Sequence, residues 1–530
     1  MRRRHQRRPR ERLDVERLRV FAVDPVASAA QVREALELLG GHDPERSGAP
    51  GAASEPAPLS QRPRDADIEP SMAPKFELDP SVQRSQTGRL LAGGTPPKRV
   101  RLNEREARIL DAILAGEPLE ADADALAREL SGTGMIAPLP PPAPTAVELT
   151  TVIPVHNGGP ELADLIASLL PRGEVIVVDD RSTDGSGELA AAAGARVVAN
   201  TGTQGPGGAR NTGLRAARSE LVAFVDADCL VEIGWSDGLA ALLQADPDLA
   251  VVGPRVRSAE GDSRVARYER RFSPLDLGPL PGVVGHGLQV GYLPAAALVG
   301  RRETLLSFGG FDESLRFGED VDLIWRLAAA GHLVRYVPQV EIEHSPRPSL
   351  SALLRQRWGY GTAAPEIEDR HPGAAAPLRA SPASYLIWLA ALHSPLSSAA
   401  VLALDSWRAT RGPEPGGSRQ SQARAVAGEH FQASLRLAHA LSREWLPLTA
   451  VAALSSRRLR RLLALALAAD AVTTGLGRSG PRLAGPLVGC LRLMDNAAYA
   501  GGLWTAAARR RAPAALLPRL KPRRCPKPAA

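Results

Sequence analysis

The chain has 530 residues, which exceeds what one hydrophobic core usually holds and predicts two or three domains. Residues 1–12 carry +6 and residues 509–530 carry +8, so the segment between them carries about −7 although the whole chain is +7. An acidic middle with only 4% aromatic residues lacks the basic, base-stacking groove that nucleic acid needs, and we expect no nucleic-acid partner. The three cysteines have neither metal-ligand nor disulfide spacing, which predicts a cytoplasmic protein.

Residues 1–74 are expected to form a disordered basic arm and a linker. The first twelve residues resemble the charged start of a signal peptide, but charges interrupt the following segment LDVERLRVFAVDP, so it lacks the apolar region that export requires. Residues 41–74 are rich in Gly, Pro, Ala, Ser and Asp, which is typical of a linker.

Residues 75–137 are expected to form a small module. Two extended runs flank a Gly-Gly-Thr-Pro turn at 93–96, and a helix follows in which Asn103 and Glu106 have the spacing of a capping box. A second helix at 122–130 and a further strand complete the pattern. This order resembles the winged-helix, PqqD-like domains that recognise peptides, while a plain N-terminal cap on the next domain explains it equally well. The proline-rich run 138–146 is expected to be a stiff spacer.

From residue 147 onward, strands alternate with helices. A mostly apolar strand ends at Pro154, a helix is expected over 161–170, and a strand at 175–178 is followed by Asp179 and Asp180. This rhythm predicts a parallel sheet with helices on both faces. Ligands of such sheets bind beyond the carboxyl ends of the strands, where these acids would lie.

The segment LVAFVDADC, 221–229, predicts a buried strand that ends in Asp226 and Asp228. Alternate residues of an extended chain point to the same side, so the two carboxylates can share a hard cation. The glycine-rich segment 202–214 lets the backbone approach a ligand, and the helix beginning near Ala209 could present free amides and Arg210 to a phosphate. Taken alone, each motif also fits an ordinary surface turn.

The order of these motifs carries a family resemblance. VIPVHN, VVDDRSTDGS, GGARNTG, VDAD and FDESLRFGEDVDLIWRL together resemble the family 2 glycosyltransferases, which have a Rossmann-like GT-A domain, here over 147–348. Within that family, RLLAGGTPPKRVRL, GYLPAAALVGRR and WGYGTAAPEIEDRHPG are similar to the mycofactocin-system glycosyltransferases. Members of that group are understood to attach glucose to premycofactocin, a peptide-derived redox cofactor precursor. The chain departs from the pattern in its N-terminal arm, at 281–290 and at 509–530. The segment 281–290 is expected to border the acceptor pocket.

The resemblance implies donor and metal roles for residues along the strand ends. Asp228 would bind a divalent metal, Mg or Mn, with Asp226 nearer the ribose and the metal-bound water. His344 would supply a further metal or diphosphate contact, or be structural. The remaining donor contacts would come from residues at three sites: Pro154 and Asp180 for the base and ribose, and Arg210 for the phosphates.

The resemblance also implies an acceptor side. Asp320 would be the general base of an inverting displacement that gives beta-linked products, and Glu319 would hold the acceptor. We expect Asp322 to have no catalytic role and to stabilise the same helix as an acid in its first turn.

Residues 349–510 are expected to form a helical region. Leu354 or Arg355, depending on the alignment, stands where processive relatives have Gln, which argues against polymer synthesis. Trp358 could stack on a sugar or pack in a core. The charge-free run 380–404 is interrupted by prolines, and two shorter apolar runs are joined by four arginines. The region would lie on a membrane surface or form a soluble cap. Residues 511–530 are expected to be a basic tail.

The sequence therefore predicts a GT-A enzyme that transfers glucose from UDP-glucose to premycofactocin, in the cytoplasm and peripherally on the inner face of the membrane. Two alternatives stay open. One is a cell-envelope polysaccharide or glycolipid transferase, and the other is a non-catalytic nucleotide-binding scaffold.

Overall fold

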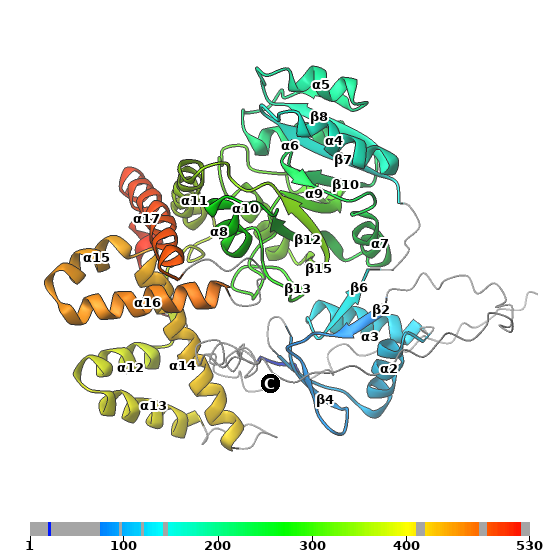
Figure 1. Ribbon diagram of the computed structural model, residues 1–530. Coiled ribbons are helices and arrows are strands. Elements are labelled where there is room, and N and C mark those ends of the chain that lie inside the picture. The colour runs from blue at the N-terminus through cyan, green and yellow to red at the C-terminus, as the bar shows by residue number, and fades with distance from the viewer. Residues whose placement is uncertain are drawn as a thin grey trace, which may run out of the picture.

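The computed structural model describes residues 20–22, 75–94, 98–117, 121–140, 147–409, 419–475 and 485–520. Three parts are distinguished (Figure 1). We call them the N-terminal module (75–140), the central domain (147–348) and the helical region (349–520). The central domain stands above the N-terminal module in this view, and the helical region lies to the left of both.

The central domain is built on a nine-stranded sheet with the order β11-β15-β12-β14-β10-β7-β8-β9, in which β13 also pairs with β15. Its strands are β7 (Leu149–Val155), β8 (Gly173–Asp179), β9 (Arg196–Ala199), β10 (Leu221–Val225), β11 (Cys229–Leu230), β12 (Leu249–Ser258), β13 (Gly282–Val283), β14 (Ala297–Arg301) and β15 (Leu333–His344).

The sheet is mixed, whereas the sequence predicted a parallel one. Strands β10, β7, β8 and β9 are parallel as predicted, but β14 runs antiparallel to both β10 and β12. Because β12 and β15 are parallel to each other, their carboxyl ends emerge at the same edge as those of β10, β7 and β8. We call this edge the catalytic rim.

Helices cover both faces of the sheet. Helices α4 (Glu161–Leu169), α5 (Ser186–Ala192) and α7 (Asp237–Ala245) pack on one face, and α6 (Pro206–Ala216), α9 (Arg302–Ser307) and α10 (Glu319–Ala329) on the other. Alternation along β10 divides its side chains between the two cores: Ala223 and Val225 face the first, Val222 and Phe224 the second. A strand buried on both faces is apolar throughout, which is why 221–225 was recognisable in the sequence.

The N-terminal module contains β2 (Lys75–Leu78), β3 (Gln83–Arg84), β4 (Leu90–Gly93), β5 (Lys98–Arg101), α2 (Glu104–Ala115), α3 (Ala121–Gly132) and β6 (Ile136–Leu139). The capping box at Asn103 and Glu106 is confirmed, with both reciprocal hydrogen bonds present. Leu110, Ile113 and Leu130 lie in one core shared by α2 and α3.

Two boundaries differ from the prediction. The proline spacer was expected to start at 138, but Pro138 is part of β6, opposite Phe76 of β2. This position is tolerated because β6 pairs on one side only, so the missing amide leaves no ladder bond unmade. Within the predicted disordered arm 1–74, Val20–Ala22 form β1, which pairs with β5. The rest of that arm lies outside the described residues.

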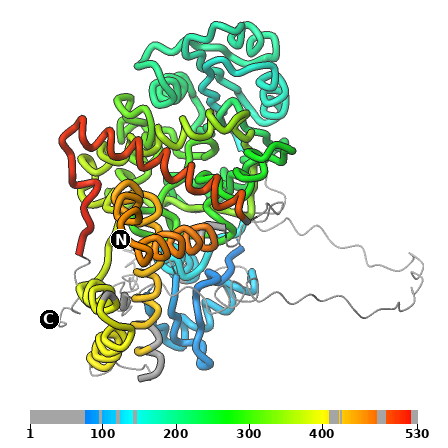
Figure 2. Tube along the Cα trace, turned by 60° about the vertical axis from the view of Figure 1, so that its left-hand side comes forward, coloured from blue at the N-terminus to red at the C-terminus, as the bar shows by residue number. Residues whose placement is uncertain are grey.

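The helical region comprises α11 (Leu350–Arg370), α12 (Pro382–His393), α13 (Pro395–Ala409), α14 (Arg419–Ser442), α15 (Leu446–Ser455), α16 (Arg457–Gly475) and α17 (Gly485–Arg510). Helices α11 and α17 lie along each other over the central domain (Figure 2). The charge-free run 380–404 is split at Ser394 into two helices. Among the described residues, no helix is long and apolar enough to cross a bilayer.

The predicted basic tail begins later than expected. Residues Pro513–Leu516 form a 3₁₀ turn, and Arg519–Leu520 form β17, which pairs with β16 (Arg379–Ala380). The Trp445 indole donates to the Leu516 carbonyl over 2.8 Å, which fixes this segment to the helical region. Residues 521–530 lie outside the described part of the chain.

Candidate active site

Three potential metal ligands meet at the catalytic rim. Asp226 directly follows β10, and Asp228 comes two residues later. His344 is the last residue of β15 and pairs with Cys229 of β11, which places its ring beside Asp228. The ligand atoms of Asp226, Asp228 and His344 all lie within 4.8 Å of one another. The structure thus brings together the three residues for which the family resemblance implied metal-related roles.

The His344 ring is oriented by its own loop. Its Nδ1 lies 2.9 Å from the Ser345 carbonyl, an acceptor, so Nδ1 carries a proton and Nε2 faces Asp228 at 3.1 Å from Oδ1. Burial would lower the pKa of His344, but the hydrogen bond and charge of Asp228 outweigh it and raise the pKa. Burial would conversely raise the pKa of Asp228, but His344 and Arg347 lower it.

This donor set suits a divalent cation. Two carboxylates and an imidazole nitrogen are ligands that Mg²⁺ or Mn²⁺ accept. The Asp226 and Asp228 side chains are 26% and 40% exposed, so a diphosphate could reach an ion held between them. A backbone carbonyl on the far nitrogen of His344 is the usual support for a metal-binding histidine.

Arg210 connects two acids of the site. It lies on α6 with its side chain buried, and its guanidinium donates to Asp226 over 2.6 Å and to Glu319 over 2.8 Å. Its charge is shared between the acid that follows β10 and the acid that begins α10, so it joins the two halves of the site. The contact of Arg210 with the donor phosphates stays a prediction.

Glu319 and Asp320 begin α10 at the rim. Asp320 Oδ2 accepts a hydrogen bond from the Ala295 amide over 3.2 Å, and Oδ1 accepts from the Val321 amide over 2.8 Å. Burial raises the pKa of Asp320, against the opposing charge of Arg210. Burial and the neighbouring Asp320 charge raise the pKa of Glu319 to about 7. Asp320 is therefore a fixed, half-buried carboxylate with increased proton affinity, as a general base requires.

Asp180 supports the glycine-rich segment. Its two carboxylate oxygens accept hydrogen bonds from the Asn200 side chain at 2.6 Å and the Gly205 amide at 2.8 Å. A side chain at Gly208 would collide with the Thr203 carbonyl 2.0 Å away, so this tight turn into α6 needs glycine. Pro154 is half-buried in β7, opposite Val178 of β8. Donor contacts of Asp180 and Pro154 stay a prediction.

Other singled-out residues have structural partners. Asp322 accepts from Arg326 at 2.7 Å and pairs with His371 at 2.9 Å, in the first turn of α10 as expected. Asp179 accepts from the Ser182 amide. Trp358 is 44% exposed on α11 and lies against Gly501 of α17.

The segment 281–290 begins with β13, where Gly282 and Val283 pair with Tyr336 and Arg335 near the start of β15. With the C-terminal end of α10 it lines a cleft of about 1030 Å³ that also borders α3 of the N-terminal module. Trp325 lines this cleft and follows Asp320 by five residues on α10, so the cleft begins about 7.5 Å along the helix axis from Asp320. The prediction that 281–290 borders the acceptor pocket is not tested by this position.

Sequence reasoning missed three contributors to the site. Arg347 lies three residues after His344, and its guanidinium is 3.4 Å from Asp228. Glu269, on α8 (Arg264–Phe272), accepts from the Arg347 amide over 2.6 Å. The Ala295 amide contacts Asp320. Only Arg347 could have been found from the sequence, because it lies beside His344 in the segment HSPR. The contacts of Glu269 and Ala295 depend on the pairing of distant parts of the chain.

Comparisons with known proteins agree with the fold and the rim. The sequence profile described as Glycosyl transferase family 2 matches residues 150–296, which include Asp226 and Asp228 and end before Asp320. A mixed sheet with an Asp-x-Asp pair after a central strand, matched by this profile, defines the class as glycosyltransferases of family 2 with a GT-A fold.

Curated relatives narrow the class. The pre-mycofactocin glycosyltransferase of Mycobacterium tuberculosis is 35% identical over 463 residues, which cover 84% of this chain and 97% of the relative. The succinoglycan biosynthesis protein ExoO of Rhizobium meliloti is 30% identical over 234 residues, covering 41% of this chain and 66% of that protein. The chain belongs to the mycofactocin-system glycosyltransferases of family 2.

Solved structures are more distant. Mannosyltransferase PcManGT from Pyrobaculum calidifontis, in complex with GDP-Man and Mn²⁺, is 19% identical with a TM-score of 0.34, covering 70% of this chain and 91% of that chain. Glucosyl-3-phosphoglycerate synthase from Mycobacterium tuberculosis, in complex with Mn²⁺, UDP and its product, is 21% identical with a TM-score of 0.31, covering 42% and 79%.

Proposed function

We propose that this protein is a metal-dependent, inverting glycosyltransferase that transfers glucose from UDP-glucose to premycofactocin and gives beta-linked glucosides. The observation that carries the proposal is the position of Asp320, a fixed carboxylate of raised pKa, across Arg210 from the Asp226, Asp228 and His344 cluster. The pre-mycofactocin glycosyltransferase, which this chain matches over 97% of that protein's length, supports the choice of premycofactocin as the acceptor.

Asp320 performs the proton transfer in this proposal. The acceptor hydroxyl donates its proton to the Asp320 carboxylate as its oxygen attacks the anomeric carbon, and UDP departs on the opposite side. A single displacement of this kind inverts the anomeric centre, so an alpha-linked donor gives a beta-linked product. The Ala295 and Val321 amides hold the carboxylate in place, and Glu319 acts through Arg210 to fix the acceptor side.

Asp228, Asp226 and His344 would hold the divalent metal ion. When bound, a divalent cation offsets the negative charge that builds on the departing diphosphate. Asp180 orders the glycine-rich segment, whose amides then lie beside the nucleotide. Pro154 lines the base, and Asp226 lies near the ribose.

The assay is mass spectrometry of purified protein with UDP-glucose, Mn²⁺ and premycofactocin. Wild-type protein should add hexose, and Asp320→Asn should lower the rate about 10²- to 10⁴-fold, as expected when a general base is lost. Glu161→Gln is the matched control, because Glu161 is also a first-turn acid but begins α4 on the other face of the sheet. Normal activity of Asp320→Asn would refute the assignment of the base.

Metal dependence is tested in the same assay. Chelation should abolish transfer, and added Mn²⁺ should restore it. Asp228→Asn should require much higher Mn²⁺ for the same rate, because one charged ligand is lost. Donor hydrolysis without transfer would direct attention to cell-envelope acceptors instead, and failure to consume the donor would favour a nucleotide-binding scaffold.

We further propose that the protein acts in the cytoplasm and binds the inner membrane surface through the hairpin of α15 and α16. Three aliphatic side chains of α15 are highly exposed: Leu448 at 56%, Val451 at 69% and Leu454 at 81%. Four exposed arginines, Arg457, Arg458, Arg460 and Arg461, begin α16 beside them. Exposed apolar residues flanked by arginines match the boundary between acyl chains and anionic headgroups.

Vesicle flotation tests this contact. Wild-type protein should float with phosphatidylglycerol vesicles and much less with phosphatidylcholine vesicles. Val451→Ser combined with Leu454→Ser should stay in solution, whereas Leu230→Ser, at a leucine of the central domain that is 50% exposed, should float. Equal flotation of all three proteins would exclude the hairpin as the contact.

A further inference from the structure

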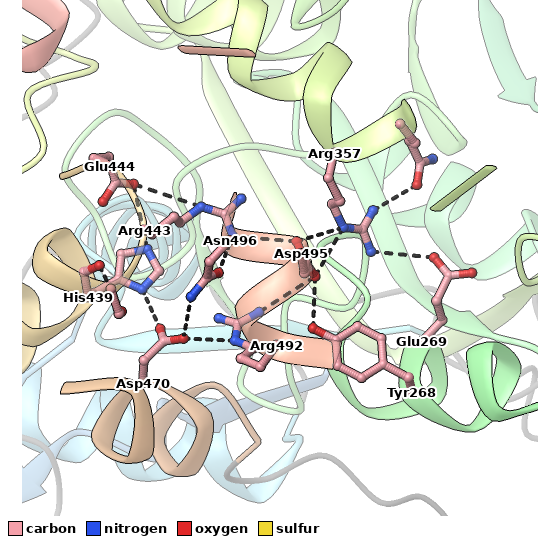
Figure 3. Close-up of polar contacts among 12 residues, drawn as sticks. Tyr268, Glu269, Arg357, His439, Arg443, Glu444, Asp470, Arg492, Asp495 and Asn496 are labelled. Atoms are coloured by element: carbon pink, nitrogen blue, oxygen red, sulfur yellow. Dashed lines mark hydrogen bonds and ion pairs between the residues drawn. The ribbon is translucent and has the colours of Figure 1, made fainter. Parts of the chain in front are cut away.

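A buried cluster of charged side chains joins the helical region to the central domain (Figure 3). Its three central members come from three helices: Glu269 from α8, Arg357 from α11 and Asp495 from α17. They are 5%, 2% and 1% exposed, so the cluster is closed to solvent at its centre. Charges buried this deeply need well-placed partners, and one of these partners belongs to a loop at the catalytic rim.

Glu269 is the link to the rim. One carboxylate oxygen accepts from the Arg347 backbone amide at 2.6 Å, and the other accepts from the Arg357 guanidinium at 3.4 Å. The loop fixed in this way begins at Ser345, whose amide donates to the Asp228 carbonyl and whose carbonyl accepts from the His344 ring. Glu269 therefore holds the backbone that orients two of the three candidate metal ligands.

Arg357 is in turn held by α17. Its Nε lies 3.3 Å from Asp495, which also accepts from the Tyr268 hydroxyl at 2.9 Å. Glu269, Arg357 and His344 line one small cavity of about 10 Å³, so the cluster and the metal ligand border the same space. No part of the function described above uses Glu269, Arg357 or Asp495.

We propose that Glu269 and Arg357 are positioning residues for the candidate metal site, and that Asp495 of α17 holds Arg357 for this task. The proposal rests on the proposed function, because it assigns the helical region a role in divalent-cation binding at that site. Outer-shell partners of metal ligands typically contribute about 10- to 100-fold to metal affinity, since they restrict the ligands to the binding geometry.

The test measures binding of Mn²⁺ in the presence of UDP, by the electron paramagnetic resonance signal of free Mn²⁺. Glu269→Met removes the acceptor of the Arg347 amide and should weaken Mn²⁺ binding about tenfold. Glu269→Gln retains a carbonyl oxygen for that amide and should recover most of the affinity. Arg357→Lys keeps the charge but loses the fork that spans Glu269 and Asp495, and should weaken Mn²⁺ binding as well. If Glu269→Met does not fold, Arg357→Lys decides.

The matched control is Arg255→Lys. Arg255 is also a buried arginine of the central domain and is bound by both oxygens of Asp276, at 2.8 and 3.0 Å, away from the 345–347 loop. Its replacement should lower the melting temperature without changing Mn²⁺ affinity. Wild-type affinity in Glu269→Met or Arg357→Lys would overturn the positioning role alone. A wild-type protein that binds no Mn²⁺ with UDP would overturn the metal-dependent function and this inference together.

Discussion

At the scale of single residues, one arginine side chain organises the site. Arg210 lies between Asp226 and Glu319, so the acid that follows β10 and the acid that begins α10 are held by the same guanidinium. Because Asp320 is the next residue after Glu319, this arrangement also sets the distance between the candidate base and the candidate metal ligands. Arg210 is thus a structural centre of the site, and its substitution would disturb both halves.

Glu319 should make stability depend on pH. Its pKa is raised to about 7 from the usual 4.5 by burial and by Asp320, so the folded protein binds a proton more tightly than the unfolded chain. The resulting stabilisation is fully present below pH 4.5 and is lost as the pH rises to 7, by on the order of 3 kcal/mol. Glu319→Gln should flatten this part of the curve of unfolding free energy against pH, measured with urea between pH 5 and 8.

A retained slope in Glu319→Gln would assign the pH dependence to other groups. Glu161→Gln serves again as the control, because Glu161 is an exposed first-turn acid for which the wild-type slope should remain.

Residues whose position follows from local patterns were predictable from the sequence. The three candidate metal ligands lie at strand ends: Asp226 after β10, Asp228 before β11 and His344 as the last residue of β15. Asp320 lies in the first turn of α10. Hydrophobic periodicity in the strands and start signals in the helix therefore place these residues on one edge of the sheet. The role of Arg210 was not predictable. Its partner Glu319 is 109 residues away, and only the tertiary fold brings the two together.

At the scale of secondary-structure elements, the crossing of α11 and α17 depends on glycine. A Cβ at Gly502 would lie 2.0 Å from the Trp358 carbonyl oxygen, and one at Gly361 would lie 2.1 Å from the Tyr499 carbonyl oxygen. The two helices therefore approach closely enough that backbone meets backbone. This close approach carries Asp495 of α17 to Arg357 of α11.

Gly502→Ala should separate the two helices. The added methyl group meets backbone that cannot rotate away, so we expect a loss of about 1–3 kcal/mol or more in unfolding free energy, measured by urea denaturation. Gly489→Ala, also on α17, is the matched control because nothing lies within 4 Å of its added Cβ. It should be neutral or stabilise by roughly 0.5–1 kcal/mol, as alanine favours helix. Equal effects of the two substitutions would mean that α11 and α17 lie farther apart at Gly502 than the structure shows.

Element types followed from the sequence more reliably than their partners. The capping box, the apolar strand 221–225 and the arginine-marked break before α16 were all local signals. The antiparallel direction of β14 was not, because an apolar strand has the same pattern in either direction. The strand at Pro138 and the ordered segment at 513–520 also depend on distant partners, β2 and β16.

At the scale of the whole molecule, a buried arginine connects the N-terminal module to the central domain. Arg335, on β15, is 2% exposed and donates to the Ser131 carbonyl at 2.8 Å and the Ser131 hydroxyl at 2.6 Å. Burial lowers the pKa of Arg335 to about 10. Since β15 also ends in His344, one strand bears both the module contact and a candidate metal ligand.

Replacing Arg335 should loosen the module without unfolding the central domain. Arg335→Met preserves much of the packed stem but leaves the buried Ser131 carbonyl without its donor, at a cost of about 1–3 kcal/mol. Amide hydrogen exchange in α3 should then accelerate about 5- to 100-fold, while exchange in β7 and β10 stays at wild-type rates. Gln339→Ala is the control, because Gln339 makes an exposed contact with Glu77 of the same module at 3.1 Å and its loss should change little. Uniform acceleration across both parts would show that they unfold as one unit, and exchange in α3 no faster than in Gln339→Ala would show that Arg335 does not hold the module.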